Sequence, residues 1–380
     1  MLLWLADGSC NLFLWTKYIG QTRVKTETPP ERTPHRRMAQ TYRQTMNFES
    51  LLDDQAAMTV ILMAVAVNLL ICRETVMNRT FRSPLALIGR LIDTLERRYN
   101  RPELTEAMRR ADGISTMVAL IVTALSAGMM IHWLLLYVPG GWLGESLILG
   151  MMLLLRTYLD QSRILADSVD RSIEESRATL ALISGRDTDM LGEAGVARGG
   201  VEHAARIFSE GIVAPIFYFW LFGLPGLLVV KIITTASFMI DEKSAYGADF
   251  GWAAARLTDM LLFPTNRIAA VFLVMGAFVA NGAAPGAAAK AMLGDHSGFS
   301  MGRLCWPVST MAGALGLSVA GQIFKECDPE KTGWVGGGTR YADSSHVRAA
   351  RRLVEYSGGL LLLVILGYLA LGIPSPSDYF

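Results

Sequence analysis

Residues 114–138 read ISTMVALIVTALSAGMMIHWLLLYV, an apolar run without a single charged side chain. The hydrocarbon core of a bilayer is about 30 Å thick and takes roughly 20 residues of helix to cross. The run therefore predicts a transmembrane helix. The residues VPGG at 138–141 then turn the chain directly into a second apolar stretch, 142–155. The two stretches predict a helical hairpin, with Glu145 as the charged residue of its second arm.

Four more apolar stretches are candidates for membrane spans, and the composition agrees with a membrane protein. The chain is 52% hydrophobic and only 18% charged, against about 25% charged residues in a typical soluble domain. The stretches are 56–72, 212–233, 268–284 and 358–373. Pro215 and the residues GLPG at 223–226 interrupt the second of them, which predicts a broken helix that is packed inside protein or lines a cavity. We expect an all-α fold, a polytopic integral membrane helical bundle.

Arginines are unevenly distributed among the connections, and they set the expected orientation. Segment 73–110 carries nine arginines and no lysine, and segment 156–206 carries seven more. A two-span hairpin between them places both segments on one side, which the positive-inside rule makes cytoplasmic. Apolar residues from Leu155 to Leu180 recur at helical spacings and predict a cytoplasmic amphipathic helix. We expect a multi-pass protein of the bacterial inner (cytoplasmic) membrane, with its site on the cytoplasmic side.

Residues 1–55 differ in composition from the rest of the chain. They include the proline-rich stretch TETPPERTPHRR at 26–37, which cannot bury enough apolar surface to fold alone. We expect a poorly structured N-terminal extension over 1–55, with Met38 and Met46 as alternative starts, and a membrane domain over 56–380. A net charge of +1 argues against nucleic acid as a partner. Neither the four cysteines nor the five histidines show metal-binding spacings.

Three polar clusters border the apolar stretches. The first combines GRDT at 185–188 with Glu202, Arg206 and Glu210, the second covers 231–256, and the third covers 306–316. Ionisable groups beside apolar walls mark a functional site by default, although solvated loops at a membrane exit would carry the same residues. In a site, the basic residues would bind phosphate and the acidic ones a hydrated Mg²⁺. The basic residues are Arg186, Lys231, Lys243 and Arg256, and the acidic ones are Asp187, Glu202 and Glu210.

In their order along the chain, these clusters resemble motifs of the CobD/CbiB family, the adenosylcobinamide-phosphate synthases of cobalamin biosynthesis. The stretch SPLALIGRLIDTLERRYN at 83–100 resembles the family's opening motif, and GRDT at 185–188 is unaltered. SEGIVAP at 209–215 stands where the family has SDGVVAP. Further matches are KIITTASFMIDEK at 231–243, FGWAAARLTD at 250–259 and MAGALG at 311–316. The likeness extends from about residue 83 to 352 and indicates a divergent member with a CobD/CbiB-like membrane domain over 56–380.

The resemblance implies a ligase that forms a C–N amide bond. Such an enzyme couples the propionate carboxylate of the corrinoid cobyric acid to aminopropanol phosphate, or to a related amino alcohol phosphate, with ATP and Mg²⁺. Its partners would be the corrinoid, the phosphorylated amino alcohol and the lipid bilayer. Position by position, the resemblance implies catalytic roles for Asp187, Glu202 and Lys243, substrate or phosphate binding by Arg186, Thr188, Ser209, Lys231, Arg256 and Trp306, and metal binding by Glu210. Asp241, in place of an aspartate that the family motif has at position 237, is the second expected metal ligand.

Several positions of the family motifs carry other residues in this chain. Ser83 stands for His, Arg206-Ile207 for Glu-Asn, Glu210 for Asp, Thr234, Ser237 and Phe238 for Asn, Asp and Ser, and Arg303 and Val308 for Asn and Glu. Exchanging Asp for Ser removes a charged ligand. Three hypotheses follow: an active synthase that uses Asp241, Glu242 or Asp249 instead, a non-catalytic membrane paralogue with an AmpE-like regulatory or assembly role, and a transporter. The synthase hypothesis requires the three clusters to gather into one anion-binding site.

Overall fold

The structure is a computed structural model that describes residues 54–71, 84–101, 103–185, 187–243, 247–294, 305–325 and 328–371. All of them belong to one unit, Phe48–Phe380. For a few of them only the backbone is described, namely 54–55, 71, 84–85, 241–243, 247–248, 320–325 and 328–333. The predicted N-terminal extension, residues 1–55, therefore lies almost entirely outside the described residues.

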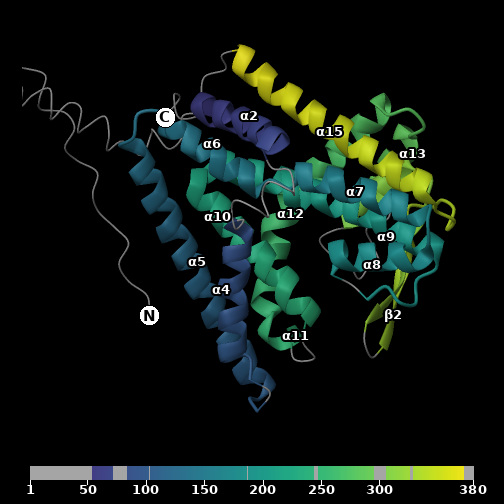
Figure 1. Ribbon diagram of the computed structural model, residues 1–380, viewed down its shortest axis with the longest axis horizontal. Helices are drawn as coiled ribbons and strands as arrows, with labels where there is room; N and C mark the ends of the chain where they lie inside the picture. The colour runs from purple at the N-terminus through teal and green to yellow at the C-terminus, as the bar shows by residue number, and fades with distance from the viewer. Residues whose placement is uncertain are drawn as a thin grey trace, which may run out of the picture. The chain divides into compact units, whose positions relative to one another are not determined.

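The described residues form a bundle of α-helices with a two-stranded β-hairpin near its C-terminal end (Figure 1). The α-helices are α2 (Asp54–Ile71), α4 (Pro84–Tyr99), α5 (Glu106–Leu136), α6 (Gly141–Met152), α7 (Leu155–Val169), α8 (Ile173–Ser184), α9 (Glu193–Arg206), α10 (Ala214–Lys243), α11 (Gly247–Phe250), α12 (Trp252–Val279), α13 (Pro285–Gly294), α14 (Cys305–Ala314) and α15 (Ser344–Leu371). A π-helical turn, η2 (Ile207–Val213), joins α9 to α10. Strands β1 (Val319–Lys325) and β2 (Asp328–Val335) pair antiparallel. The predicted all-α class is confirmed, and the hairpin is an addition to it.

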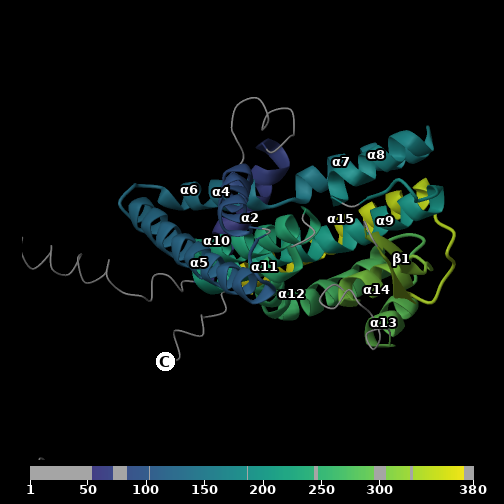
Figure 2. The same ribbon diagram turned by 90° about the horizontal axis from the view of Figure 1, so that it is seen from below.

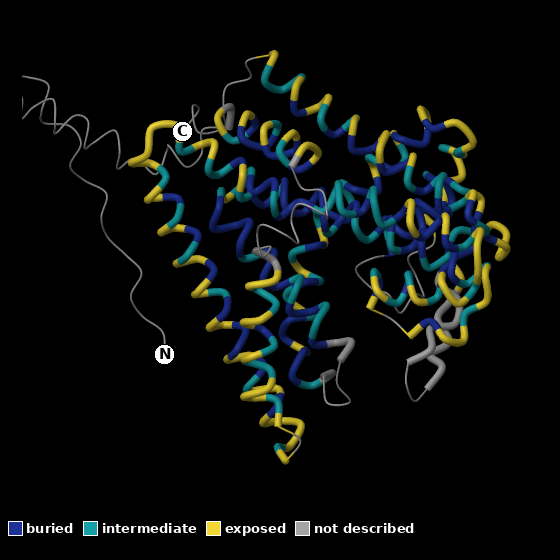
Figure 3. The backbone as a smooth tube through the Cα atoms, viewed as in Figure 1, coloured by how far each residue is buried: buried dark blue, intermediate teal, exposed yellow. Residues whose placement is uncertain are grey.

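Among the residues that the structure describes, five helical segments are long and apolar enough to cross a membrane, which agrees with a multi-pass membrane protein. They are Glu106–Leu136, Gly141–Val169, Glu193–Ile240, Trp252–Val279 and Ser344–Leu371. The predicted span at 56–72 is a shorter apolar helix, Ala56–Leu70. On α5, Val118, Val122, Leu125 and Met129 are exposed at spacings of three and four residues, which is the stripe expected of a lipid-facing surface. Figure 3 shows this exposed side along α5 and the buried centre of the bundle.

The predicted hairpin between the first two spans is confirmed. The chain turns at Gly140, whose φ of +80° favours glycine, and the N–H of Gly141 donates to the Val138 carbonyl at 2.9 Å. Glu145 of α6 faces His132 of α5, with 2.5 Å between Glu145 Oε1 and His132 Nδ1. The two side chains are only 16% and 10% exposed. A partner on the other arm therefore accounts for an acidic residue inside an apolar segment.

A buried asparagine of α2 holds the break between α6 and α7. Asn68 is fully buried, and its Nδ2 donates to the carbonyls of Gly150 at 2.9 Å and Leu153 at 2.8 Å. Its Oδ1 accepts from the N–H of Arg156 at 3.0 Å. These are backbone groups that an interrupted helix leaves without intrahelical partners. One side chain thus stabilises both sides of the break.

The predicted amphipathic helix after this break is divided in two. Helix α7 ends at Val169, and Ser172 starts α8 by accepting a hydrogen bond from the N–H of Glu175 at 3.2 Å. A serine hydroxyl that caps a new helix competes with continuation of the old one. The apolar spacing predicts the correct faces, but it does not reveal this cap.

The motif SEGIVAP at 209–215 forms the π-helical turn η2 and the start of α10. The N–H of Ala214 donates to the Ser209 carbonyl, five residues back. Pro215 has no N–H and so offers no donor to the Gly211 carbonyl four residues before it. The N–H of Leu154, at the α6–α7 break, donates to that carbonyl at 3.2 Å. Two interrupted helices therefore join through a main-chain hydrogen bond.

The predicted break at 223–226 lies within α10. Gly223 has φ +61° and ψ −151°, a conformation that only glycine adopts readily, and Pro225 follows it. A Cβ at Gly128 of α5 would lie 2.6 Å from the Pro225 Cα, so α5 and α10 pack backbone against backbone at this point. The break itself is confirmed. If the first two polar clusters form one site, the segment must return to the side of the membrane that it left, and this return stays a prediction.

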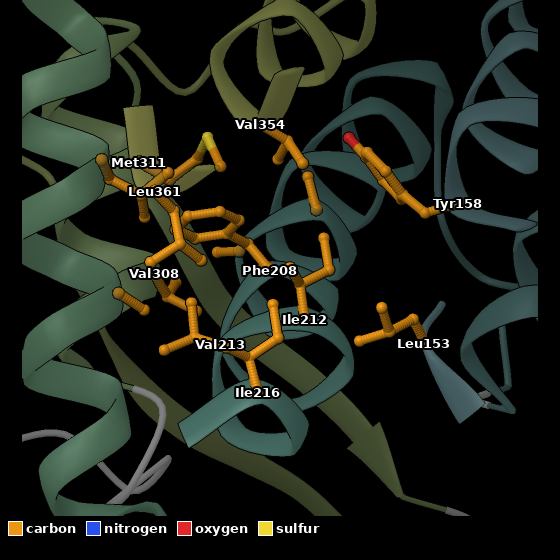
Figure 4. Close-up of a cluster of buried hydrophobic side chains, with 14 of the residues drawn as sticks. Leu153, Tyr158, Phe208, Ile212, Val213, Ile216, Val308, Met311, Val354 and Leu361 are labelled. Carbon is orange, nitrogen blue, oxygen red and sulfur yellow. The ribbon is translucent and has the colours of Figure 1, made fainter. Parts of the chain in front are cut away.

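A continuous apolar core surrounds η2 and connects it to the C-terminal part of the chain. Phe208 is fully buried, and Figure 4 shows it among side chains of the neighbouring segments: Ile212, Val213, Ile216, Val308, Met311, Val354 and Leu361. Helix α9 packs against α7, α8, α14, α15 and β1. Figure 2 shows α7 and α8 on one side of α9, and α13 and α14 on the other. The polar residues of α9 and η2 are therefore positioned by a rigid apolar support.

Candidate functional site

A buried positive cluster lies where η2 meets α10. Arg206 Nε is 3.1 Å from Glu210 Oε2, and the two side chains are 15% and 14% exposed. Lys231 of α10 is 3% exposed and is attracted electrostatically by Glu210. The guanidinium carbon of Arg206 also lies 4.9 Å from the centre of the Phe238 ring. Two cations and one carboxylate thus share a largely dry environment, which we call the Lys231 cluster (Arg206, Glu210, Lys231 and Phe238).

Ser209 and Ser237 flank this cluster and are buried as well. The Ser209 hydroxyl donates to Oδ1 of Asn266 on α12, and both residues are at most 1% exposed. Ser237 is 2% exposed. The structure therefore brings Ser209, Glu210 and Lys231, three of the residues selected from the sequence, to the junction of η2, α10 and α12. Asn266 was missed, because a buried amide inside an apolar helix carries no local motif.

The motif GRDT at 185–188 is folded back onto α8. Gly185 ends α8 with φ +70°, as a glycine C-cap does. The Thr188 hydroxyl donates to the Arg177 carbonyl at 2.9 Å, and Asp187 is exposed and accepts from the N–H of Asp189 at 3.0 Å. Arg186 lies outside the described residues. Thr188 therefore has a structural hydrogen bond in addition to any role in binding.

Glu202 belongs to a second charged group, on α9. It is 8% exposed and attracts Arg198, one helical turn before it. The guanidinium carbon of Arg198 lies 5.2 Å from the centre of the Trp334 ring, and that of Arg340 lies 4.4 Å from the same ring. Arg198, Trp334 and Arg340 are not among the residues that the sequence motifs predict for the site. We call this group the Trp334 cluster (Arg198, Glu202, Trp334 and Arg340).

The remaining selected residues are not part of either cluster as described. Arg256 is exposed on α12, and Trp306 of α14 is half-buried with the guanidinium of Arg267 4.7 Å from its ring centre. The side chains of Asp241, Glu242 and Lys243 are not described, and neither are Ser83 and Arg303. Val308, where the family has Glu, is 1% exposed inside the apolar core. The expected convergence of all three clusters therefore stays a prediction.

A resident metal site is not formed by the acidic residues that the structure describes. Among the described residues, no group of three or more His, Cys, Asp or Glu side chains is arranged to hold a metal ion. The Glu210 carboxylate is paired with Arg206, and metal binding by Glu210 and Asp241 stays a prediction. Magnesium commonly reaches a protein through one or two carboxylates together with phosphate oxygens of the substrate.

A comparison with models of protein families shows to which family the chain belongs. The family model described as CobD/Cbib protein matches residues 61–354, which is most of the chain. The chain belongs to the CobD/CbiB family. CobD/CbiB membership places it in cobalamin biosynthesis, as the resemblance of its motifs predicts. The matched region contains both the Lys231 cluster and the Trp334 cluster.

Curated relatives of the CobD/CbiB family support the assignment. The chain is 34% identical over 241 residues to the Cobalamin biosynthesis protein CobD of Sinorhizobium sp, covering 63% of this chain and 75% of that protein. It is 30% identical over 273 residues to the protein of the same name from Rhodobacter capsulatus, covering 70% of this chain and 82% of that protein. The protein of Sinorhizobium fredii, 30% identical over 265 residues, covers 69% and 81%. No solved structure matches the chain.

Proposed function

We propose that the chain is a ligase of the adenosylcobinamide-phosphate synthase type. It joins the propionate carboxylate of cobyric acid to the amine of aminopropanol phosphate, or of a related amino alcohol phosphate, and forms a C–N amide bond. The oxygen that the carboxylate loses leaves on a phosphoryl group of ATP, and Mg²⁺ accompanies the nucleotide. The reaction takes place on the cytoplasmic side of the bacterial inner membrane.

The Lys231 cluster is the observation that carries this proposal. Both substrates are anions, and a cation binds carboxylate or phosphate more strongly where water is excluded. Lys231 and Arg206 supply two cations against the single carboxylate of Glu210. The excess charge lies beside Ser209, in a π-helical turn of a kind that recurs at functional sites. Glu202, a buried carboxylate on the adjoining helix, is the candidate acceptor for the proton that the attacking amine loses.

A coupling assay tests the proposal. Membranes that contain the chain, from a host without its own synthase, are incubated with adenosylcobyric acid, aminopropanol phosphate, ATP and Mg²⁺, and the amide product is measured by chromatography. We expect product only when both substrates and ATP are present. Lys231→Met should lower kcat/KM by at least about 10². Arg171→Gln, which changes an exposed arginine paired with Glu175 on α8, serves as the matched control.

One observation favours a non-catalytic paralogue with a regulatory or assembly role. Several expected binding groups are already used within the protein: Glu210 pairs with Arg206, the Ser209 hydroxyl donates to Asn266, and the Thr188 hydroxyl donates to the Arg177 carbonyl. Ligand-induced stabilisation separates the two functions. A ligand at about 100 times its Kd stabilises the folded protein by roughly 2.7 kcal/mol. A folded protein that neither turns over nor gains stability with cobyric acid or ATP would be the paralogue.

A further inference from the structure

The Trp334 cluster brings together residues from three distant segments. Arg198 lies on α9, Trp334 on β2, and Arg340 in the connection that leads to α15. The two guanidinium carbons are 5.2 and 4.4 Å from the centre of the same indole ring. Arg198 Nη1 also donates to the Arg340 carbonyl, across 142 residues of sequence. The packing of β1 against α9 makes this meeting possible.

The charges of this cluster are not balanced among its members. The positive charge of Arg340 repels the Arg198 guanidinium, whereas the negative charge of Glu202 attracts it. Glu202 is buried, whereas Arg340 is exposed, Arg198 is half-buried and Trp334 is 38% exposed. The positive side of the cluster therefore faces outward and the negative side inward. Cation–π contact at an exposed ring offsets only a small part of the repulsion between the arginines.

The backbone beside the cluster is held in place before any ligand arrives. The Thr339 N–H donates to the Gly316 carbonyl at 3.0 Å, and the Ser318 N–H donates to the Thr339 carbonyl at 2.7 Å. The Ser318 hydroxyl donates to the Gly338 carbonyl at 2.8 Å. A Cβ at Gly336 would lie 2.3 Å from the Leu317 carbonyl oxygen, so this approach requires glycine. Arg340 is thus presented from a fixed loop, which lowers the entropic cost of binding.

We propose that Arg198 and Arg340 bind the phosphate chain of a nucleoside triphosphate. A guanidinium donates two parallel hydrogen bonds to phosphate oxygens, and two guanidiniums on one indole ring present two such forks to a single polyanion. The anion also removes the repulsion between the arginines. This inference rests on the proposed function, because that reaction consumes ATP, and it assigns the nucleotide to α9 and the loop after β2.

The binding experiment uses the whole chain, purified and placed in discs of zwitterionic lipid. The thermal midpoint is followed while ATP with Mg²⁺, inorganic tripolyphosphate or adenosine is added. We expect ATP and tripolyphosphate to bind to the unaltered chain and to Arg171→Gln with equal Kd. Arg198→Gln and Arg340→Gln should each raise both Kd values about tenfold, the equivalent of one charge-assisted hydrogen bond. An unchanged Kd in both variants overturns the inference.

Further variants and arms keep the result interpretable. The Arg340 side chain is exposed, so Arg340→Gln leaves the core intact, and Arg340→Lys, which keeps the charge and loses the fork, should give an intermediate Kd. Binding of adenosine but not of tripolyphosphate would contradict the phosphate assignment. If the chain couples its substrates but Arg340→Gln leaves the KM for ATP unchanged, the inference fails and the proposed function stands. If the unaltered chain binds ATP and the variants do not, but the unaltered chain fails to couple cobyric acid to aminopropanol phosphate, the proposed function fails and the inference stands.

Discussion

The guanidinium carbon of Arg206 lies 4.9 Å from the centre of the Phe238 ring. Both residues stand where the CobD/CbiB motifs carry others, since Arg206 replaces Glu and Phe238 replaces Ser. Their contact shows that two departures from the motifs form one physical unit. Glu210, a third departure, completes it through its ion pair with Arg206. The region around Lys231 is therefore rebuilt with a consistent set of residues.

Glu210→Gln should destabilise the protein strongly. The substitution leaves Arg206 and Lys231 largely buried without their counter-charge, and breaking a buried pair costs about 3–5 kcal/mol. Thermal midpoints in a fixed detergent measure the effect. Glu175→Gln, in a pair whose side chains are 65% and 45% exposed, is the control and should cost at most about 1 kcal/mol. Equal losses in the two variants would show that the Lys231 cluster is solvated.

Arg206 and Phe238 should be energetically coupled. A double-mutant cycle with Arg206→Gln and Phe238→Leu removes the cation–π contact and keeps an apolar side chain at 238. Partly buried contacts of this type are worth about 1–2 kcal/mol, so the double variant should be more stable than the two single losses predict. Unfolding free energies of the four proteins give the coupling. If the two single losses of stability add up to the loss in the double variant, Arg206 and Phe238 do not stabilise each other.

Asn68→Ala should lower stability by at least about 2 kcal/mol. It removes the partners of two carbonyls and one N–H at the α6–α7 break, and each unsatisfied buried group costs about 1–3 kcal/mol. Asn68→Asp keeps the acceptor for the Arg156 N–H but cannot donate to either carbonyl, so it should not restore stability. Thr94→Ala removes an exposed hydroxyl that bonds within its own helix and is the control. A loss no larger than the control's would mean that water replaces the amide.

The charge distribution predicts that residues 103 and 190 lie on the same, cytoplasmic side of the membrane. Glu103 and Met190 are exposed in connections outside the spans. Glu103→Cys and Met190→Cys, in a chain without its four native cysteines, should react with an impermeant thiol reagent in inverted vesicles only. Labelling from opposite sides would refute the orientation derived from the arginines.

Asp343 should make stability sensitive to acid. Its carboxylate accepts the Ser345 hydroxyl and the Ser345 N–H at 2.6 and 2.9 Å at the start of α15. The Ser345 hydroxyl, followed by His346, lowers the pKa of Asp343 from its ordinary 3.8 to about 2. A lowered pKa stabilises the fold above pH 3.8, and this contribution is lost as the pH falls to 2. The midpoint of the unaltered chain should fall relative to that of Asp343→Asn across this window, and parallel curves would exclude the effect.

Much of the membrane part of the fold could be predicted, because apolar length and arginine position have direct physical meaning in a bilayer. The hairpin at 114–155 and the break at Gly223 followed from an uncharged run, from VPGG and from GLPG. Helices α12 and α15 begin at Trp252 and Ser344, far before the predicted 268 and 358. A helix keeps its backbone hydrogen bonds when it leaves the apolar layer, so hydrophobicity marks only part of its length.

The candidate site was predictable only where its residues are close in sequence. Arg206 and Glu210 stand four apart, a spacing at which side chains on one helical face meet. The meeting of Glu210 with Lys231 depends on how η2 and α10 are packed, which no local pattern encodes. The Trp334 cluster joins α9 to the connection before α15, 142 residues away, through a β-hairpin that the sequence pattern does not predict. The segment that forms this hairpin is charged and lacks the alternating apolar pattern of a half-buried strand.

The hydrogen bond from Leu154 to Gly211 has a consequence for how this junction evolves. Both atoms are part of the main chain, and every residue except proline supplies the same donor. Drift at position 154 can therefore alter the size of the side chain without deleting the link, and Leu154→Pro is the single exchange there that abolishes it. Side chains around this junction can thus be replaced during evolution, while the main-chain hydrogen bond continues to join the α6–α7 break to η2.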